Sequence, residues 1–358
     1  VGSEMCIRDR FQNFGKTSNR GIELSVNVDV INKGDFRFNV GAIYNYNRNK
    51  LDELPNADQY LYSSYWGSSS LVPTNDYMFV EGKAIGLVRG FISEGYYTVD
   101  DFNYTNGQYV LKEGVPDITK ALTATYMHPY DLPAGQTAFP GAAKFRDVDE
   151  SGTVDLDDAT CLGEVMPRHT GSFQLNFNYK NFDLSTNFNW TAGGKVYNVA
   201  AMINASGQEF DGIGAQRASW VADAFKVYNV NAAGDLYAVT NPDELRALNA
   251  NAKYHLPYHQ SGITSSEWLE NGSYLRLQTL TLGYTLPKNW LTKVHVDKIR
   301  LYLTATNLFT ITGYSGIDPE VNANPTGQSG FYSDLRIFPT LNHGLRNLPA
   351  CTHIHFRC

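Results

Sequence analysis

The sequence predicts an all-β chain of long antiparallel hairpins, of the kind that cross a membrane as part of a β-barrel. Apolar and polar residues alternate along its main segments, and short turns alternate with long excursions. The 358 residues include 23 Tyr, 19 Phe and 31 Gly, but only 18% of them are charged. This composition favours alternating strands over amphipathic helices, which generally carry more Lys, Glu and Leu.

The first hairpin, residues 21–47, has one apolar face and one polar face. One face of its first arm is entirely aliphatic, with Ile22, Leu24, Val26, Val28 and Val30. A tight turn is expected at residues 32–35, and the return arm alternates in the same way except at Ile43. Arms of roughly ten residues suit a membrane barrel, whereas strands of a soluble sandwich typically run about five or six. Both folds remain open on this hairpin alone.

The second hairpin, residues 173–190, repeats the design around a turn at Lys180 and Asn181. Only Thr186 interrupts its apolar face, and its other face is rich in amides and hydroxyls. Because such groups cost roughly 1–3 kcal/mol each when buried without a partner, we expect this face to meet water. Tyr179 and Trp190 stand at strand ends, where a membrane barrel carries its interfacial aromatic residues. In a sandwich the same residues would cap the core.

Two further strands are predicted at residues 274–286 and 298–306. Leu280 and Leu282 share one face, whereas Leu275 and Leu277 fall on the opposite parity. This change predicts a bulge near Gln278 or a change of environment there.

Charge and cysteine content exclude several classes of protein. The net charge of −7 supplies no basic face for nucleic acid. No run approaches the roughly 18 apolar residues that a transmembrane helix needs. The four cysteines have no zinc-like spacing, and three of them lie near the ends of the chain, so they predict no disulfide framework.

Residues 147–158 match the pattern of a twelve-residue calcium-binding loop. Gly152 at position 6 permits the sharp turn, and oxygen-bearing groups stand at the positions that converge on the ion. The candidate ligands are Asp147, Asp149, Ser151, Thr153, Asp155 and Asp158. Asp158 replaces the usual, longer Glu, and no flanking amphipathic helices indicate an EF-hand protein. A Ca²⁺ site and an acidic turn without an ion both remain open.

Six stretches, in the same order, resemble the C-terminal part of the SusC/RagA-type TonB-dependent outer-membrane importers, the nutrient receptors of Bacteroidetes. They are NFGKTSNRGIELSVNV (13–28), FVEGKAIGLVRGF (79–91), PGAAKFRDVDESGTVDLDD (140–158), GEVMPRHTGSF (163–173), NGSYLRLQTLTLGYTLP (271–287) and NLFTITGYSGIDPEV (307–321). Six ordered matches are more specific than any single motif.

The resemblance implies a 22-stranded barrel in the outer membrane, closed by an N-terminal plug and covered by a SusD-like surface lipoprotein. Such importers take up oligosaccharides or peptides, and the TonB complex pulls on the plug. This chain would supply part of the barrel wall, in contact with outer-membrane lipid, and several long extracellular loops. The plug and the TonB box would lie outside these residues.

The resemblance covers residues 11–340 and sets the two ends apart. Residues 1–10 contain no apolar signal-peptide region and are expected to be a non-native leader. Residues 341–358 are expected to be an aberrant C-terminus, because the family usually closes on an alternating strand that ends in Phe. A frame error explains this segment better than a metal site at His353, His355 and Cys358.

For an importer, the aromatic residues of the long segment 51–75 are expected to contact ligand, since aromatic faces stack on sugars or peptide side chains. These residues are Tyr60, Tyr62, Tyr65 and Trp66. Alternatively, they stabilise the loop or contact the lipoprotein.

No catalytic constellation is recognisable, so we expect no enzyme. One alternative is a secreted β-sandwich, stabilised by calcium, that binds or hydrolyses carbohydrate. A structural adhesin is another, and it would need no companion lipoprotein. The sandwich would bury the apolar faces of the hairpins under a second sheet, whereas a barrel exposes them to lipid.

Overall fold

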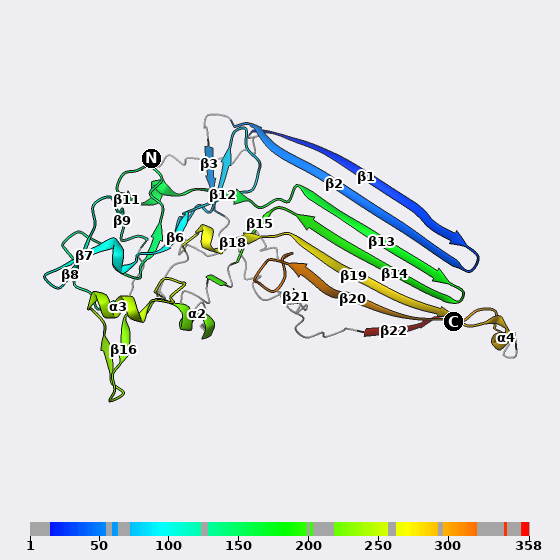
Figure 1. Cartoon of the computed structure of the whole chain (residues 1–358). Coiled ribbons are helices and arrows are strands. Elements are labelled where there is room, and N and C mark those ends of the chain that lie inside the picture. Colours follow the sequence, from blue (N-terminus) through cyan, green and yellow to red (C-terminus); the bar gives the residue numbers. More distant parts are fainter. Residues whose placement is uncertain are drawn as a thin grey trace, which may run out of the picture.

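The computed structural model describes the following residues: 15–54, 59–63, 72–122, 128–198, 201–202, 218–256, 263–292 and 296–320, with the backbone of 340–341 and 352–357. The residues form a long twisted sheet and, at one end of it, a cluster of short strands and helices (Figure 1). Among the described residues, no helix combines the length and hydropathy that a bilayer crossing requires.

Six long strands run side by side across the sheet, and each is antiparallel to its neighbour. In spatial order they are β1 (Lys16–Lys33), β2 (Phe36–Glu53), β13 (His169–Tyr179), β14 (Phe182–Ala192), β19 (Tyr274–Thr285) and β20 (Arg300–Thr312). The hairpins predicted from the alternation are therefore confirmed, and the first is longer than expected. Short connections join the strands at one end of the sheet, and the long excursions leave from the other (Figure 1).

The turn of the first hairpin is tighter than expected. Lys33 pairs with Phe36, so only Gly34 and Asp35 lie between the strands, and Gly34 takes a φ of 57°. The register shifts between Asp29 and Ile31, which places Val30 in an irregularity rather than in the regular apolar row. The prediction for the other four aliphatic residues of this arm is confirmed by their regular pairing with β2.

The bulge predicted near Gln278 is present. Leu277 pairs with Phe188 on β14, and Thr279 pairs with the adjacent Asn187, so Gln278 is an additional residue of β19 relative to β14. In a strict alternation, Leu275 and Leu277 would face the side of the sheet opposite to Leu280 and Leu282. One inserted residue reverses the alternation, so that all four side chains face the same side. Leucines on both sides of the bulge therefore share the apolar face of the sheet.

Residues 352–357 form β22 (Thr352–Arg357), which pairs with β20 in antiparallel register, and β21 (Thr340–Leu341) is a short parallel neighbour of β20. Whether residues 341–358 are aberrant stays a prediction. The proposed leader, residues 1–10, lies outside the described residues.

The cluster at the long-loop end, here called the external loops, contains short sheets. One has the order β12 (Thr160–Glu164), β5 (Leu87–Gly90), β4 (Tyr77–Val80) and β3 (Gln59–Tyr62). The two-stranded pairs are β6 (Ser93–Tyr96) with β10 (Ala143–Phe145), β7 (Phe102–Thr105) with β8 (Gln108–Leu111), β9 (Asp117–Ile118) with β11 (Thr153–Val154), β15 (Lys195–Tyr197) with β18 (Leu269–Asn271), and β16 (Tyr228–Val230) with β17 (Leu236–Ala238).

The described residues also form short helices. They are η2 (Val99–Asp101), η3 (Leu156–Asp158), α2 (Ala218–Asp223), α3 (Pro242–Leu248), η4 (Ser266–Trp268) and α4 (Lys288–Leu291). Of these described helices, α4 alone lies at the short-turn end of the sheet (Figure 1).

The main hydrophobic core lies in the external loops and not against the long sheet. Phe91, Tyr97 and Leu245 have no exposed surface there, and they come from segments far apart in the sequence. In contrast, Val26 in β1 is 56% exposed and Leu282 in β19 is 45% exposed. The external loops thus resemble a small globular core, whereas the apolar face of the sheet is left open.

Candidate functional site

The apolar face of the long sheet is continuous across all six strands. The pairing brings Val26 opposite Ala42, Ala42 opposite Phe173, and Phe173 opposite Phe188, so one row of apolar side chains crosses four strands. Stacked rings reinforce it, with the centroids of Phe173 and Phe188 4.5 Å apart. Among the described residues, no second sheet packs on this face. This arrangement fits a surface that contacts lipid.

The polar residue within this face, Thr186, is satisfied locally. Thr186 is only 8% exposed, and its hydroxyl donates to the backbone carbonyl of Leu175 at 3.3 Å. A hydroxyl on a lipid-facing surface needs such a partner because hydrocarbon offers none.

Aromatic residues gather in two belts at the two ends of the apolar face. At the long-loop end, Trp190 stacks on Tyr44 with 6.1 Å between ring centroids, and the Tyr44 hydroxyl lies 2.9 Å from Nδ1 of His169. At the short-turn end, Tyr179 contacts Phe36 with 6.5 Å between centroids. The structure thus places Trp190 and Tyr179 near opposite ends of their strands, as the sequence predicts.

The separation of the belts matches a membrane. Ten residues along β2 separate Phe36 from Tyr46, which lies at the long-loop belt. This length is about 33 Å of strand and, at the tilt usual in barrels, about 25 Å along the membrane normal. The apolar band of an outer-membrane barrel has about this height.

The opposite face of the sheet is lined by polar side chains that bond from strand to strand. Asn39 on β2 donates to Asn27 and Asp29 on β1 at 2.7 and 2.9 Å. Asn176 on β13 donates to Asn39 at 3.4 Å, and Ser185 on β14 donates to Asn176 at 2.6 Å. Most of these residues are exposed or half-buried, so the face is hydrated. It can offer amide and hydroxyl groups to a polar ligand.

The bulge residue belongs to this polar face. Gln278 accepts hydrogen bonds from the amides of Asn187 and Asn189 at 3.2 and 2.7 Å. Further along β19, Thr281 and Thr304 share a hydrogen bond of 3.0 Å. The ladder of polar side chains therefore reaches from β1 to β20.

A buried cation joins the sheet to the segment that follows β20. Arg276 is 7% exposed, and its guanidinium donates to Thr310 at 3.0 Å and to Asp318 at 2.6 Å. It also pairs with the carboxylate of Glu320. A charge at this depth is tolerated only when it is paired and hydrogen-bonded. The arrangement ties the end of β19 to residues 313–320.

A second anchor holds the same segment. The carboxylate of Glu270 accepts from the backbone and the hydroxyl of Ser315, each at 2.6 Å, and from the amide of Asn198 at 2.7 Å. Between the two anchors, burial raises the pKa of Tyr314 to about 12. Sequence reasoning missed both anchors. A lone Arg in an alternating strand, followed by a short acidic motif, is the signal that could have found the first.

The acidic loop brings three of its six candidate ligands together. Carboxylate oxygens of Asp147, Asp149 and Asp158 all lie within 4.8 Å of one another. Asp158 is fully buried and accepts from the backbone of Val148 at 2.6 Å and of Asp155 at 2.8 Å. Because hydrogen bonding to Ser151 lowers the pKa of Asp149, that carboxylate stays ionised.

The other three candidate ligands make contacts within the loop. The carboxylate of Asp155 accepts from the backbone of Asp157 at 2.8 Å and thereby caps η3. The hydroxyl of Ser151 donates to the carbonyl of Thr153 at 3.0 Å. Gly152 has a φ of 87°, as the sharp turn requires. The structure therefore places three carboxylates at the centre of the loop, and whether the loop binds Ca²⁺ stays a prediction.

Two of the four aromatic residues expected to contact ligand lie on β3. Tyr60 and Tyr62 are 50% and 41% exposed, and both rings contact Phe79 on β4, with centroids 6.4 and 6.3 Å apart. Tyr65 and Trp66 lie outside the described residues. The two described tyrosines contact Phe79 through tilted and edge-on rings and keep exposed surface.

Comparisons with curated proteins find receptors. The chain is 28% identical over 316 residues to the TonB-dependent receptor P3 of Formosa agariphila, covering 88% of this chain and 26% of that protein. It is 25% identical over 327 residues to the TonB-dependent receptor SusC of Bacteroides thetaiotaomicron, covering 88% of this chain and 25% of SusC. The chain thus spans about a quarter of the length of these relatives. No family model matches it.

Comparison with solved structures gives the fold. The structure of the RagAB peptide transporter matches with a TM-score of 0.56 and 21% identity, covering 86% of this chain and 27% of that one. The same importer in its open-open state matches with a TM-score of 0.56 and 21% identity, covering 87% and 27%.

The fold and the two faces of the sheet define a segment of an antiparallel transmembrane β-barrel with long extracellular loops. The fold class predicted from the sequence is therefore confirmed. Within that class, the chain is a relative of the TonB-dependent receptors of the SusC/RagA type. The curated relatives are named as receptors.

Proposed function

We propose that this chain forms part of the barrel wall and the extracellular loops of an outer-membrane TonB-dependent importer in a Gram-negative bacterium of the Bacteroidetes type. The importer takes up oligosaccharides or peptides. One observation carries the proposal: a continuous apolar face bounded by two aromatic belts lies back to back with a hydrated polar face. The chain itself catalyses no reaction.

The partners follow from the relatives. A TonB-dependent receptor draws energy from the TonB complex through a region outside this chain, and a SusD-like surface lipoprotein covers the external mouth. Oligosaccharide or peptide is the proposed cargo, and the name of a solved neighbour, a peptide transporter, supports the second of these. The polar face of the sheet and the exposed rings of Tyr60 and Tyr62 support a polar ligand, and Tyr65 and Trp66 are proposed to extend the same surface.

The acidic loop is proposed to hold one Ca²⁺. Calcium binds oxygen ligands at about 2.3–2.6 Å, so two ligands on opposite sides of the ion lie about 5 Å apart. The mutual spacing within 4.8 Å of the Asp147, Asp149 and Asp158 oxygens fits this limit. Ser151, Thr153 and Asp155 are near enough in the loop to complete the shell directly or through water. The ion would fix the loop beside β9, where Thr153 pairs with Asp117.

The rival hypothesis, a secreted calcium-stabilised β-sandwich, lacks this support. A sandwich buries one face of each sheet about 10 Å from a second sheet. Val26 and Leu24 are both 56% exposed, and among the described residues nothing covers them.

Opposite faces of β1 provide the test. In a receptor that carries this chain, Val26→Arg puts a charge on the lipid face near mid-membrane, and Ser25→Arg puts the same charge on the hydrated face one residue away. A charge at the bilayer midplane costs about 2–4 kcal/mol. We expect Val26→Arg to reduce the folded receptor in outer-membrane fractions and Ser25→Arg to leave it near the wild-type amount. Equal amounts for the two variants, or a greater loss for Ser25→Arg, would reject the barrel wall.

A further inference from the structure

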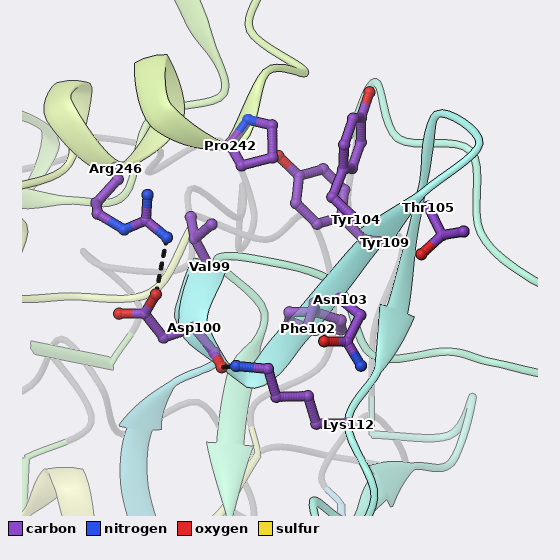
Figure 2. Close-up of a pocket in the computed structure, with 10 residues that line it drawn as sticks. All are labelled: Val99, Asp100, Phe102, Asn103, Tyr104, Thr105, Tyr109, Lys112, Pro242 and Arg246. Atoms are coloured by element: carbon purple, nitrogen blue, oxygen red, sulfur yellow. Dashed lines mark hydrogen bonds and ion pairs between the residues drawn. The ribbon is translucent and has the colours of Figure 1, made fainter.

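The external loops contain a hollow of about 500 Å³ that neither the barrel wall nor the acidic loop uses. It lies between the β7–β8 hairpin and α3, at the end of the molecule away from the short turns (Figures 1 and 2). Its lining is mostly polar. We propose that this hollow is a surface site for a neutral sugar residue of a glycan chain. The proposal rests on the proposed function only in placing these loops outside the cell.

The floor of the hollow is rigid before any ligand arrives. Tyr109 is 1% exposed, and its hydroxyl donates to the carbonyl of Thr240 at 2.8 Å. Gln136 holds β8 from behind, because its side chain donates to the Tyr109 carbonyl at 2.8 Å and accepts from Leu111 at 2.9 Å. A site fixed in this way loses little entropy on binding.

One aromatic ring in the hollow is available for stacking. Tyr104 is 42% exposed, and its ring centroid lies 4.9 Å from that of Tyr109 at an interplanar angle of 53°. Figure 2 shows the two rings side by side, with the Tyr109 phenol reaching toward Pro242. Tyr104 therefore rests on a buried ring and keeps part of its surface open. Such a ring can cover the apolar face of a sugar.

Hydrogen-bonding groups surround this ring. Asn103 and Thr105 flank Tyr104 on β7, and among the described residues neither side chain has a hydrogen-bond partner. Lys112 donates one of its three N–H groups to the carbonyl of Asp100, which leaves two. An amide, a hydroxyl and an ammonium group around one exposed ring suit a ligand that carries several hydroxyls.

The charges in and beside the hollow cancel. Arg246 pairs with Asp100 at 2.8 Å and with Asp243 at 2.9 Å, and Lys112 lies on the other side of Asp100 (Figure 2). Two carboxylates thus balance two cations. A sulfated or phosphorylated ligand would meet Asp100, and a cationic ligand would meet Arg246 and Lys112. The balance selects a neutral ligand.

A matched pair of tyrosines tests the site. Tyr104→Ala removes the stacking ring, and Tyr228→Ala removes a tyrosine of the same 42% exposure on β16, outside the hollow. The solubilised receptor is titrated with neutral hexasaccharides of glucose, xylose and mannose, with a sulfated hexasaccharide and with a mixed hexapeptide. We expect at least one neutral sugar to bind the wild type, Tyr104→Ala to weaken it about tenfold, and Tyr228→Ala and Tyr104→Phe to bind near the wild-type level.

Several results would overturn the site. They are no binding of any neutral hexasaccharide, an equal loss in the two alanine variants, preference for the sulfated sugar, or a loss confined to the peptide. Tyr104→Ala is expected to leave the folded receptor in the outer membrane unchanged. Rejection of this site would therefore not reject the proposed importer function, because that function is tested separately by the substitutions on the lipid face of β1.

Discussion

Arg276 on β19 and Asp318, 42 residues further along the chain, share a hydrogen bond of 2.6 Å between guanidinium and carboxylate. This contact joins two of the stretches that carry the resemblance to SusC/RagA receptors, YLRLQTLTLGYTLP and GYSGIDPEV. Their side chains at the contact are 8% and 16% exposed, so water screens the pair only weakly. The contact holds residues 313–320 against the polar face of the sheet.

The first prediction concerns this anchor. Asp318→Asn removes the charge of the less exposed carboxylate and leaves Glu320, whose side chain is 46% exposed, as the negative partner of the buried guanidinium. We expect the free energy of local opening of residues 313–320 to fall by about 1–3 kcal/mol, measured by hydrogen exchange on the folded receptor. Glu320→Gln is the matched control and should cost less, because the more exposed carboxylate is better solvated. A larger effect for Glu320→Gln would contradict the assignment of Asp318 as the main partner.

The second prediction concerns calcium. The receptor should bind one Ca²⁺ in the acidic loop, with a dissociation constant of about 0.1–1 mM, as is usual for extracellular modules. Asp147→Asn should weaken binding about tenfold, because it removes one of three charged ligands. Asp157→Asn makes the same charge change in a residue outside the candidate ligands. Calorimetric titration should separate the two variants, and an equal affinity in both would reject the site.

The third prediction is a pH dependence of the external loops. Burial lowers the pKa of His128, whose ring stacks on Phe139 with 4.0 Å between centroids and whose Nδ1 accepts from the backbone of Tyr130 at 3.3 Å. The folded state therefore holds this histidine neutral. Its contribution to stability is present above the unfolded pKa of about 6.5 and is lost as the pH falls through the lower folded value.

This dependence can be measured by the thermal unfolding of the solubilised receptor between pH 7.5 and pH 5. The midpoint should fall as the solution is acidified, and His128→Phe, which keeps an aromatic ring but does not titrate, should flatten that part of the curve. An unchanged slope in His128→Phe would assign the acid sensitivity to other groups.

The sequence was most informative where one physical constraint acts along a strand. Lipid on one side and water on the other impose a strict alternation, so the faces of the hairpins and the bulge at Gln278 could be predicted from parity alone. The irregularity at Val30 was not predicted, because Val30 and Ile31 are both apolar and a one-residue shift between them leaves the pattern almost unaltered.

The external loops were far less predictable. Their core joins residues such as Phe91, Phe139 and Leu245, which are more than forty positions apart and follow no period. The hollow beside Tyr104 likewise depends on α3 approaching β7, and no local sequence motif predicts such a contact. The acidic loop is the exception, since the spacing of its candidate ligands is local and three of the six, Asp147, Asp149 and Asp158, lie together.

The last prediction tests whether the bulge sets the register of β19. Deletion of Gln278 removes the residue that β19 has in excess of β14 between Leu277 and Thr279. If the part from Thr279 onward keeps its pairing, Leu275 and Leu277 move to the polar face and Arg276 moves to the lipid face. A charge there costs about 2–4 kcal/mol near mid-membrane and less near the interface, and Arg276 would also lose Asp318 and Glu320.

We therefore expect the Gln278 deletion to abolish or strongly reduce the folded receptor in outer-membrane fractions. Gln278→Ala keeps the additional backbone residue and loses only the hydrogen bonds from Asn187 and Asn189, so it should cost about 1 kcal/mol and assemble nearly normally. Heat-modifiability on gels, which separates folded from unfolded barrels, gives the readout. If the deletion variant assembles as well as Gln278→Ala, the bulge is not needed to keep Leu275 and Leu277 on the same face as Leu280 and Leu282. The assignment of Leu275 and Leu277 to the lipid face would then be wrong.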